Sequence, residues 1–168
     1  MFIILPKHVP EAVCFDMIEI YKNNEDSAEV WRDTNILKIN SESISNHEEL
    51  DRCKRTVNYV NNAAISFCGR GTYAERAEIV KWPTGSHQAP HTDVNRESTT
   101  YTSVTYLNDD FQGGETDFTT ENFSVKPKVG RTILFDGKRF EHGVKTITEG
   151  VRYTFALWYS NNIMDCLV

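Results

Sequence analysis

The segment His91-Thr92-Asp93 carries two side chains that can ligate a metal ion. Side chains alternate along an extended chain, so His91 and Asp93 point to the same side and can reach one ion. A histidine and a carboxylate at this spacing are not specific by themselves, because the pair arises often by chance. A metal site would need a further ligand from elsewhere in the chain.

His142 is the candidate for that ligand, and it lies at the edge of an expected strand. If a barrel brings His142 beside His91 and Asp93, two imidazoles and one carboxylate meet on one face. This set is the facial triad of non-haem iron(II) sites, which leaves coordination positions open for a bidentate cosubstrate and oxygen.

Arg152 follows His142 inside the apolar stretch 151–159. An arginine in such a strand is costly to bury unless it is paired. Period-two alternation gives it small or polar neighbours such as Thr154 and Ala156, while larger apolar residues take the opposite face. A planar guanidinium binds a carboxylate through a two-point fork, so Arg152 is a candidate anchor for a carboxylate ligand. An internal ion pair with a glutamate is the alternative.

Short strands must position these residues. From residue 73 onward, apolar residues recur with period two, and turn residues fill the breaks. Strands are expected at Tyr73–Trp82, Thr99–Leu107, Glu115–Phe118, Phe123–Val125, Thr132–Phe135, Gly143–Thr146 and Val151–Ser160. Strands at this spacing are typical of a sandwich or jelly roll.

Helices are expected before residue 73. Pro10 opens one helical pattern, and Asn46 with Glu49 resembles the capping box of a second helix that ends at residues 69–71. Short strands are expected at Phe2–Leu5 and Ile36–Ile39. We therefore predict an α+β, mainly β fold in a single domain, 1–168. Its double-stranded β-helix core (jelly roll, cupin-like) spans about 73–160, and N-terminal helices within about 1–72 pack on one outer face.

Composition narrows the function classes. The 168 residues include 18 Lys plus Arg and 24 Asp plus Glu, for a net charge of −6, which disfavours a nucleic-acid partner. No segment has the length of a membrane span or the layout of a secretory signal. The four cysteines are scattered, so we expect free thiols in a reducing, cytoplasmic location.

Taken together, His91, Asp93, His142 and Arg152 on a strand-rich chain resemble the 2-oxoglutarate- and iron(II)-dependent dioxygenases, and among them the prolyl 4-hydroxylase branch. The resemblance covers about residues 73–160. Further motifs carry it: Tyr106-Leu107-Asn108, Gly113-Gly114-Glu115-Thr116-Asp117-Phe118, residues 127–130 and His142-Gly143-Val144.

The resemblance implies a role for each matching residue. The iron ligands would be His91, Asp93 and His142. The cosubstrate-binding residues would be Arg152 on the far carboxylate of 2-oxoglutarate, Tyr106 as a hydroxyl donor to it, Thr102 as a further contact, and Trp82 where many family members have tyrosine. Trp158 would lie near the metal. The implied cofactors are Fe(II), 2-oxoglutarate and O2, with ascorbate as a reductant, and the coproducts are succinate and CO2.

Within this chemistry, we predict hydroxylation of a proline residue in a peptide or protein substrate. The alternatives are the same reaction on another protein residue or on a small molecule, or a non-catalytic metal-binding module. Loops at residues 69–72 and 94–100 are candidates for substrate contact. The retained carboxylate ligand Asp93 favours hydroxylation over halogenation, because related halogenases lack it.

Overall fold

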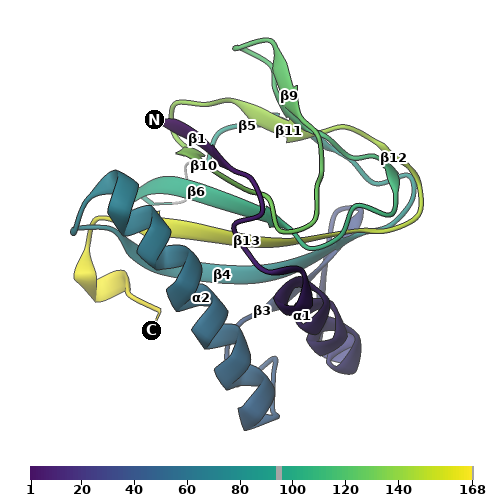
Figure 1. Cartoon of the computed structure of the whole chain (residues 1–168), viewed down its shortest axis with the longest axis horizontal. Coiled ribbons are helices and arrows are strands. Elements are labelled where there is room, and N and C mark those ends of the chain that lie inside the picture. The colour runs from purple at the N-terminus through teal and green to yellow at the C-terminus, as the bar shows by residue number, and fades with distance from the viewer. Residues whose placement is uncertain (94–95, 168) are drawn as a thin grey trace.

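Two sheets face each other and form the body of the protein (Figure 1). The computed structural model describes residues 1–93 and 96–167. The larger sheet has the order β1-β10-β6-β13-β4-β3-β2. Its strands are β1 (Phe2–Leu5), β2 (Glu29–Trp31), β3 (Thr34–Lys38), β4 (Tyr73–Trp82), β6 (Thr99–Tyr106), β10 (Thr132–Asp136) and β13 (Arg152–Ser160).

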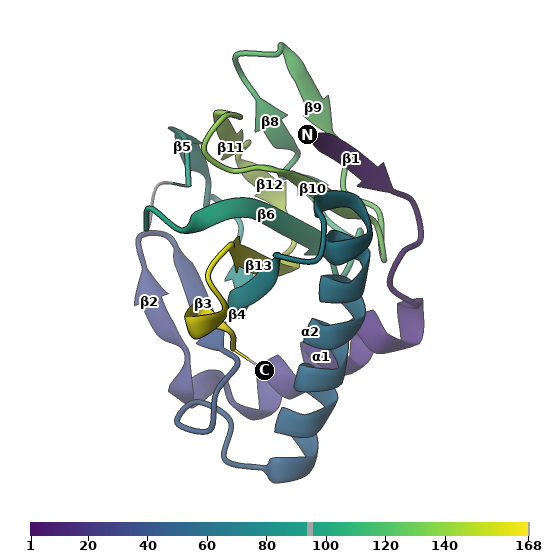
Figure 2. The same cartoon turned by 90° about the vertical axis from the view of Figure 1, so that its left-hand side faces the viewer.

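The smaller sheet lies across β6, β10 and β13 and has the order β5-β11-β8-β9 (Figure 2). Its strands are β5 (Gln88–His91), β8 (Thr116–Phe118), β9 (Phe123–Val125) and β11 (His142–Val144), and a separate pair joins β7 (Gln112–Gly113) to β12 (Ile147–Glu149). An aromatic cluster fills one end of the space between the sheets; its buried members are Tyr106, Phe118, Val125, Ile133, Phe135 and Phe140.

Two helices, α1 (Glu11–Asn23) and α2 (His47–Cys68), cover the outer face of the larger sheet (Figures 1 and 2). The short 3-10 helices η1 (Glu25–Ser27) and η2 (Ile163–Asp165) follow α1 and β13. The side chain of Asn46 caps α2 by accepting from the backbone N–H groups of Glu48 and Glu49, which confirms the predicted helix start.

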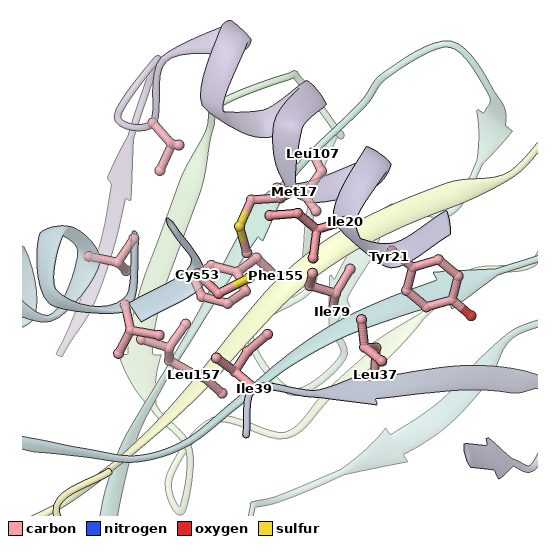
Figure 3. Close-up of a cluster of buried hydrophobic side chains, with 14 of the residues drawn as sticks. Met17, Ile20, Tyr21, Leu37, Ile39, Cys53, Ile79, Leu107, Phe155 and Leu157 are labelled. Carbon is pink, nitrogen blue, oxygen red and sulfur yellow. The ribbon is translucent and has the colours of Figure 1, made fainter. Parts of the chain in front are cut away.

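The main hydrophobic core lies between the helices and the larger sheet (Figure 3). Met17 and Ile20 of α1 and Cys53 of α2 pack there against Phe155 and Leu157 of β13. The alternate residues of β13 point to the other face of the sheet, as its period of two requires. One face of β13 therefore stabilises the fold and leaves the opposite face for a site.

The predicted jelly-roll core with outer helices is confirmed, and β1, β4 and β9 have the predicted bounds. The two strands expected before residue 73 correspond to β1 and β3, and with β2 they pair into the larger sheet, so the N-terminal support contributes strands to the core as well as helices. The short strands β2, β5, β7 and β12 were not predicted.

The predicted substrate loop 94–100 lies partly outside the described residues, since residues 94 and 95 are not among them. No helix in the part of the chain that the structure describes combines the length and the apolar character needed to cross a membrane.

Candidate active site

Pairing between two short strands of the smaller sheet brings the two candidate histidine ligands together. His142, at the start of β11, is the register partner of His91, at the end of β5. Their ring centroids are 4.5 Å apart. His142 is buried and His91 is half-buried, so His91 forms the more open side of the pair.

Asp93 completes the cluster from the segment that follows β5. Its Oδ1 lies 3.6 Å from His91 Nε2, and its Oδ2 lies 3.6 Å from His142 Nε2. One ligand atom from each of the three residues falls within 4.8 Å of the others. This spacing and donor set suit one divalent metal ion bound by two imidazoles and a carboxylate.

Hydrogen bonds to the backbone set the orientation of both imidazoles. His91 Nδ1 lies 3.1 Å from the carbonyl oxygen of Ala89, and His142 Nδ1 lies 3.1 Å from that of Phe140. A carbonyl only accepts, so both Nδ1 atoms carry the proton and both Nε2 lone pairs face the cluster. The Gln88 side-chain amide lies 3.1 Å from His91 Nε2. An amide nitrogen only donates, so this contact agrees with an Nε2 atom that carries no proton.

Two further contacts hold Asp93. The Thr102 hydroxyl on β6 donates to Asp93 Oδ2 at 2.5 Å, and the Asp93 backbone N–H donates to the carbonyl of Gly137 at 2.8 Å. A Cβ atom on Gly137 would lie 2.6 Å from Thr102 Oγ1 and 3.0 Å from Asp93 Cβ. Gly137 therefore leaves the space that this carboxylate needs.

The electrostatics of the cluster keep the Asp93 carboxylate ionised. Burial alone would raise the pKa of Asp93, but the contacts with His91, His142 and Thr102 lower it on balance. Burial also acts to lower the pKa of His91, but the hydrogen bonds to Asp93 and to the Ala89 carbonyl, together with the Asp93 charge, outweigh it and raise that pKa. Burial dominates for His142 and lowers its pKa.

Arg152, the first residue of β13, is 1% exposed. Its Nη2 donates to the Thr116 hydroxyl at 3.3 Å, whereas its Nε and Nη1 are buried without a hydrogen-bond partner. Among the described residues, no carboxylate lies within 4.0 Å of the guanidinium, so the alternative of an internal ion pair is not realised. Burial lowers the pKa of Arg152 to about 10, which leaves it charged at neutral pH.

Aromatic side chains surround the guanidinium. Its Cζ lies 4.9 Å from the Trp82 ring centroid and 5.4 Å from that of Tyr106. The Tyr106 hydroxyl is within 2.7 Å of the Thr116 hydroxyl, and burial raises the pKa of Tyr106. The Trp82 indole N–H donates to Thr154 Oγ1 at 3.1 Å, so its ring, rather than its donor, faces Arg152.

One cavity of about 400 Å³ joins these groups. The metal-ligand cluster and Arg152 both line it, together with Trp82, Thr102 and Thr116. Tyr106 lies directly behind Thr116. A buried cation with unused donors at one end of a cavity is suited to bind a carboxylate, and the three-ligand cluster is suited to bind a metal.

The structure therefore brings every sequence-predicted site residue to this cavity or its wall, and their individual roles remain predictions. Thr102 contacts Asp93, and a cosubstrate contact by Thr102 is untested. Sequence reasoning missed Thr116, Gly137 and Glu78, which lie at or beside the cavity. The segment Gly113 to Phe118 was noted as a motif, but nothing in it indicated that Thr116 would contact Arg152.

Comparison with known proteins agrees with this geometry. The family model described as the 2OG-Fe(II) oxygenase superfamily matches residues 77–160. A stretch of 66 residues is 47% identical to prolyl 3-hydroxylase 2 of Homo sapiens and 41% identical to prolyl 3-hydroxylase 1 of Gallus gallus. It covers 36% of this chain, and only 9% of either relative, so the similarity concerns a small part of those proteins.

Solved structures share the fold along almost the whole chain. A prolyl 4-hydroxylase of Pseudomonas putida has a TM-score of 0.77 at 16% identity, covering 96% of this chain and 92% of that one. A prolyl hydroxylase of Trichoplax adhaerens, solved with a hypoxia-inducible-factor peptide fragment, has a TM-score of 0.77 at 20% identity, with coverage of 95% and 83%. A viral collagen prolyl hydroxylase of Paramecium bursaria Chlorella virus-1, solved with 2-oxoglutarate, has a TM-score of 0.70 at 19% identity, with coverage of 95% and 94%.

Proposed function

Because this chain belongs to the 2OG-Fe(II) oxygenase superfamily, we propose that it hydroxylates a proline residue of a peptide or protein substrate. The reaction would consume 2-oxoglutarate and O2 and yield succinate, CO2 and the hydroxylated residue. The observation that carries the proposal is the presence of two complementary features in one cavity. These are a two-histidine, one-aspartate cluster and a buried arginine with unused donors.

The residues present fit both cofactors. His91, Asp93 and His142 would hold iron(II), since both Nε2 lone pairs and the ionised carboxylate face one point. Arg152 would bind the far carboxylate of 2-oxoglutarate through Nε and Nη1, which lack partners within the chain. When bound, iron(II) and 2-oxoglutarate supply the oxidising chemistry that the side chains of a protein lack.

The chain itself supplies position and a dry environment. Thr116 accepts a hydrogen bond from Arg152 and is itself hydrogen-bonded to Tyr106, so both residues help to position the guanidinium. Arg152 is 1% exposed, and burial strengthens the attraction between its positive charge and a carboxylate. Thr102 holds Asp93 so that the carboxylate keeps its orientation toward the two histidines. We propose that residues 1–168 act together as one catalytic domain.

A proline target is supported by the curated relatives, which are prolyl 3-hydroxylases, and by the fold, which prolyl 4-hydroxylases share. Attack at the 4-position is our first expectation, because the sequence motifs resemble that branch. The relatives make the 3-position a second candidate. The product must therefore be identified by its hydroxyproline isomer.

The first experiment tests the cofactors under anaerobic conditions. Iron(II) and 2-oxoglutarate are added to the purified protein, and the visible charge-transfer band of the iron chelate is followed. We expect the band with the wild-type chain and its loss in His142→Ala. If no band forms while the fold and metal binding are intact, the proposed cosubstrate is wrong.

The second experiment tests the substrate. A panel of proline-containing peptides is incubated with iron(II), 2-oxoglutarate, ascorbate and air, and succinate formation and peptide mass are measured. We expect stoichiometric succinate and addition of one oxygen atom, assigned to 3- or 4-hydroxyproline by amino-acid analysis. Turnover with a small molecule and with no peptide would contradict the proline assignment.

A further inference from the structure

The cavity continues past the metal-ligand cluster along the inner face of the larger sheet. Register places Trp158 and Ala156 of β13 beside Arg76 and Glu78 of β4, and Lys38 of β3 beside Glu78. All of these side chains line the cavity. The cavity wall on this side therefore contains charged groups that the proposed cofactors do not use.

Glu78 is the most deeply buried of these charges, at 5% exposure. Its nearest charged partner is Arg76, whose Nε lies 3.5 Å from Glu78 Oε1. Within the described part of the chain, no hydrogen bond to the Glu78 carboxylate is formed, and Arg76 Nε is also without one. A buried carboxylate without a hydrogen-bond donor costs stability, so Glu78 is a polar group in need of a partner.

The guanidinium of Arg76 also lies over the ring of Trp158. The guanidinium Cζ lies 3.7 Å from the centroid of the Trp158 ring, within the range of a cation–π interaction. The Trp158 indole N–H is buried without a partner. We call Arg76, Glu78 and Trp158, which all line the cavity, the outer subsite: Glu78 contributes acceptors, and Arg76, whose side chain is 42% exposed, contributes guanidinium donors.

Arg76 and Glu78 of the outer subsite are separated from Thr102 by the width of two strand pairings, and Trp158 stands between them as the register partner of both Thr102 and Arg76. Thr102, which bonds to Asp93, lies on β6, and β13 stands between β6 and β4. Adjacent strands are about 4.8 Å apart, so the separation is about 10 Å across the sheet. A free amino acid held at the outer subsite would not reach the metal, whereas a residue next to the target in a peptide would.

We propose that the outer subsite binds the main chain of the peptide substrate beside the target proline: Glu78 accepts a backbone N–H, and Arg76 donates to a backbone carbonyl. This inference rests on the proposed function and adds a specificity-determining pair to it. The Arg76–Glu78 pair has no net charge. Its carboxylate accepts hydrogen bonds, and its guanidinium donates them. The pair therefore matches a peptide group, which is neutral and carries one donor and one acceptor.

Charge balance nearby supports a neutral ligand group. Lys38 already bonds to Glu29 at 2.7 Å, so this second pair adds no net charge to the wall. Burial raises the pKa of Glu78, and the Glu29 carboxylate acts in the same direction, while Arg76 and Lys38 act in the opposite direction. A donor from the substrate would replace part of the hydration that Glu78 loses on folding.

The test measures peptide binding to the chain loaded anaerobically with iron(II) and 2-oxoglutarate. The probe is a peptide that the wild-type chain hydroxylates, together with a series of esters that replace one backbone N–H at a time by oxygen. We expect Glu78→Leu to weaken binding of the amide peptide about tenfold, the effect of one charge-assisted hydrogen bond. One ester should weaken wild-type binding similarly and have no further effect on Glu78→Leu.

Two further variants separate a binding role from a structural one. Glu78→Gln keeps a carbonyl acceptor and should retain part of the affinity. Glu42→Gln removes an exposed acid that does not line the cavity and should bind like wild type. The charge-transfer band of Glu78→Leu should form at the wild-type 2-oxoglutarate concentration. A shift in that concentration would mean a general structural defect and would overturn the inference.

The outcomes also separate this inference from the proposed function. If no proline peptide binds or reacts with the wild-type chain, the proposed function fails and the peptide subsite with it. If peptides react but Glu78→Leu binds them as tightly as wild type, or no ester depends on Glu78, only the subsite is wrong. Hydroxylation of free proline that is lost in Glu78→Leu would assign the pair to a zwitterion instead.

Discussion

The position and orientation of the Asp93 carboxylate are set by neighbouring residues that are not themselves candidate metal ligands. Thr102 bonds to one of its carboxylate oxygens, and the carbonyl of Gly137 accepts from its backbone N–H. Groups that orient a ligand commonly matter for metal affinity, because they remove the cost of ordering that ligand on binding. At the scale of single residues, the candidate metal site therefore consists of three ligands and of the residues that orient them, such as Thr102 and Gly137.

Gly137→Ala tests this support. The new Cβ would lie 2.6 Å from Thr102 Oγ1, so Thr102 or Asp93 must shift. We expect metal affinity to fall about 10- to 100-fold, measured by anaerobic iron(II) titration. The backbone of Gly137 is not in the left-handed region, so the loss would report the contact and not backbone strain.

A double variant checks that the two residues act together. If Gly137→Ala acts through Thr102, adding Thr102→Ala should cost less than the sum of the two single losses. Strictly additive losses would contradict a shared contact.

Arg152 permits a second prediction at this scale. Arg152→Ala removes the cation proposed to bind the far carboxylate of 2-oxoglutarate. We expect the half-saturating 2-oxoglutarate concentration of the charge-transfer band to rise by roughly 30- to 1000-fold, equivalent to about 2–4 kcal/mol for a buried charged pair. Arg55→Ala, at an exposed position on α2, is the control and should leave it unchanged. An unaltered cosubstrate requirement in Arg152→Ala would return this arginine to a purely structural role.

At the scale of elements, the pairing of β5 with β11 decides whether the two histidines meet. Both strands are short, and their register changes between His142 and Val144. Gly143 lies between these two residues, where a Cβ would stand 2.6 Å from the backbone oxygen of Gln88. The strands can approach this closely only because position 143 has no side chain.

Gly143→Ala should therefore separate β5 from β11 and abolish the charge-transfer band, while α1, α2 and the larger sheet stay folded. Circular dichroism checks the fold, and the band checks the site. The control is Gly71→Ala, because a Cβ there would meet nothing within 4 Å. A wild-type band in Gly143→Ala would show that the register of these strands does not position His91 and His142.

At the scale of the whole molecule, the larger sheet divides its two faces between stability and function. Its outer face packs under the helices, and its inner face carries Arg152 and Glu78 toward the cavity. Both are buried charges with unused hydrogen-bonding capacity, which a chain selected for stability alone would avoid. The core between the sheet and the helices must offset their cost.

The cost of burying the Glu78 carboxylate predicts that the free energy of unfolding depends on pH. Burial raises the pKa of Glu78 above its ordinary value of 4.5, despite the nearby Arg76 and Lys38. The folded chain thus binds this proton more tightly than the unfolded chain, so the stability contributed by Glu78 is full below the ordinary pKa and is lost as the pH rises through the folded pKa. Glu78→Gln should exceed wild type in free energy of unfolding at about pH 7, and by less at about pH 4.

Denaturant unfolding of both chains at the two pH values measures this difference. Glu42→Gln, which changes an exposed acid away from the cavity, is the control for the loss of one negative charge. A Glu78→Gln chain that is less stable than wild type at neutral pH would mean that the ion pair with Arg76 outweighs burial.

Features that depend on a local pattern of residues could be predicted from the amino-acid sequence. Period-two alternation predicted β4 and β9 with their bounds, the Asn46 cap predicted the start of α2, and the spacing of His91 and Asp93 predicted ligands on one side of an extended segment. Alternation also separated the two faces of β13, because side-chain direction follows from the backbone alone.

The contacts between these elements follow from the tertiary fold and could not be predicted from the sequence. The pairing of β5 with β11, the contact of Thr116 with Arg152 and the close approach at Gly137 join segments that are distant in sequence. Glu78 reads as an ordinary polar residue of an alternating strand, and it becomes a buried group facing a cavity only when β3 and β13 pair on either side of β4. Such contacts depend on register between distant strands, which the pattern within one strand does not encode.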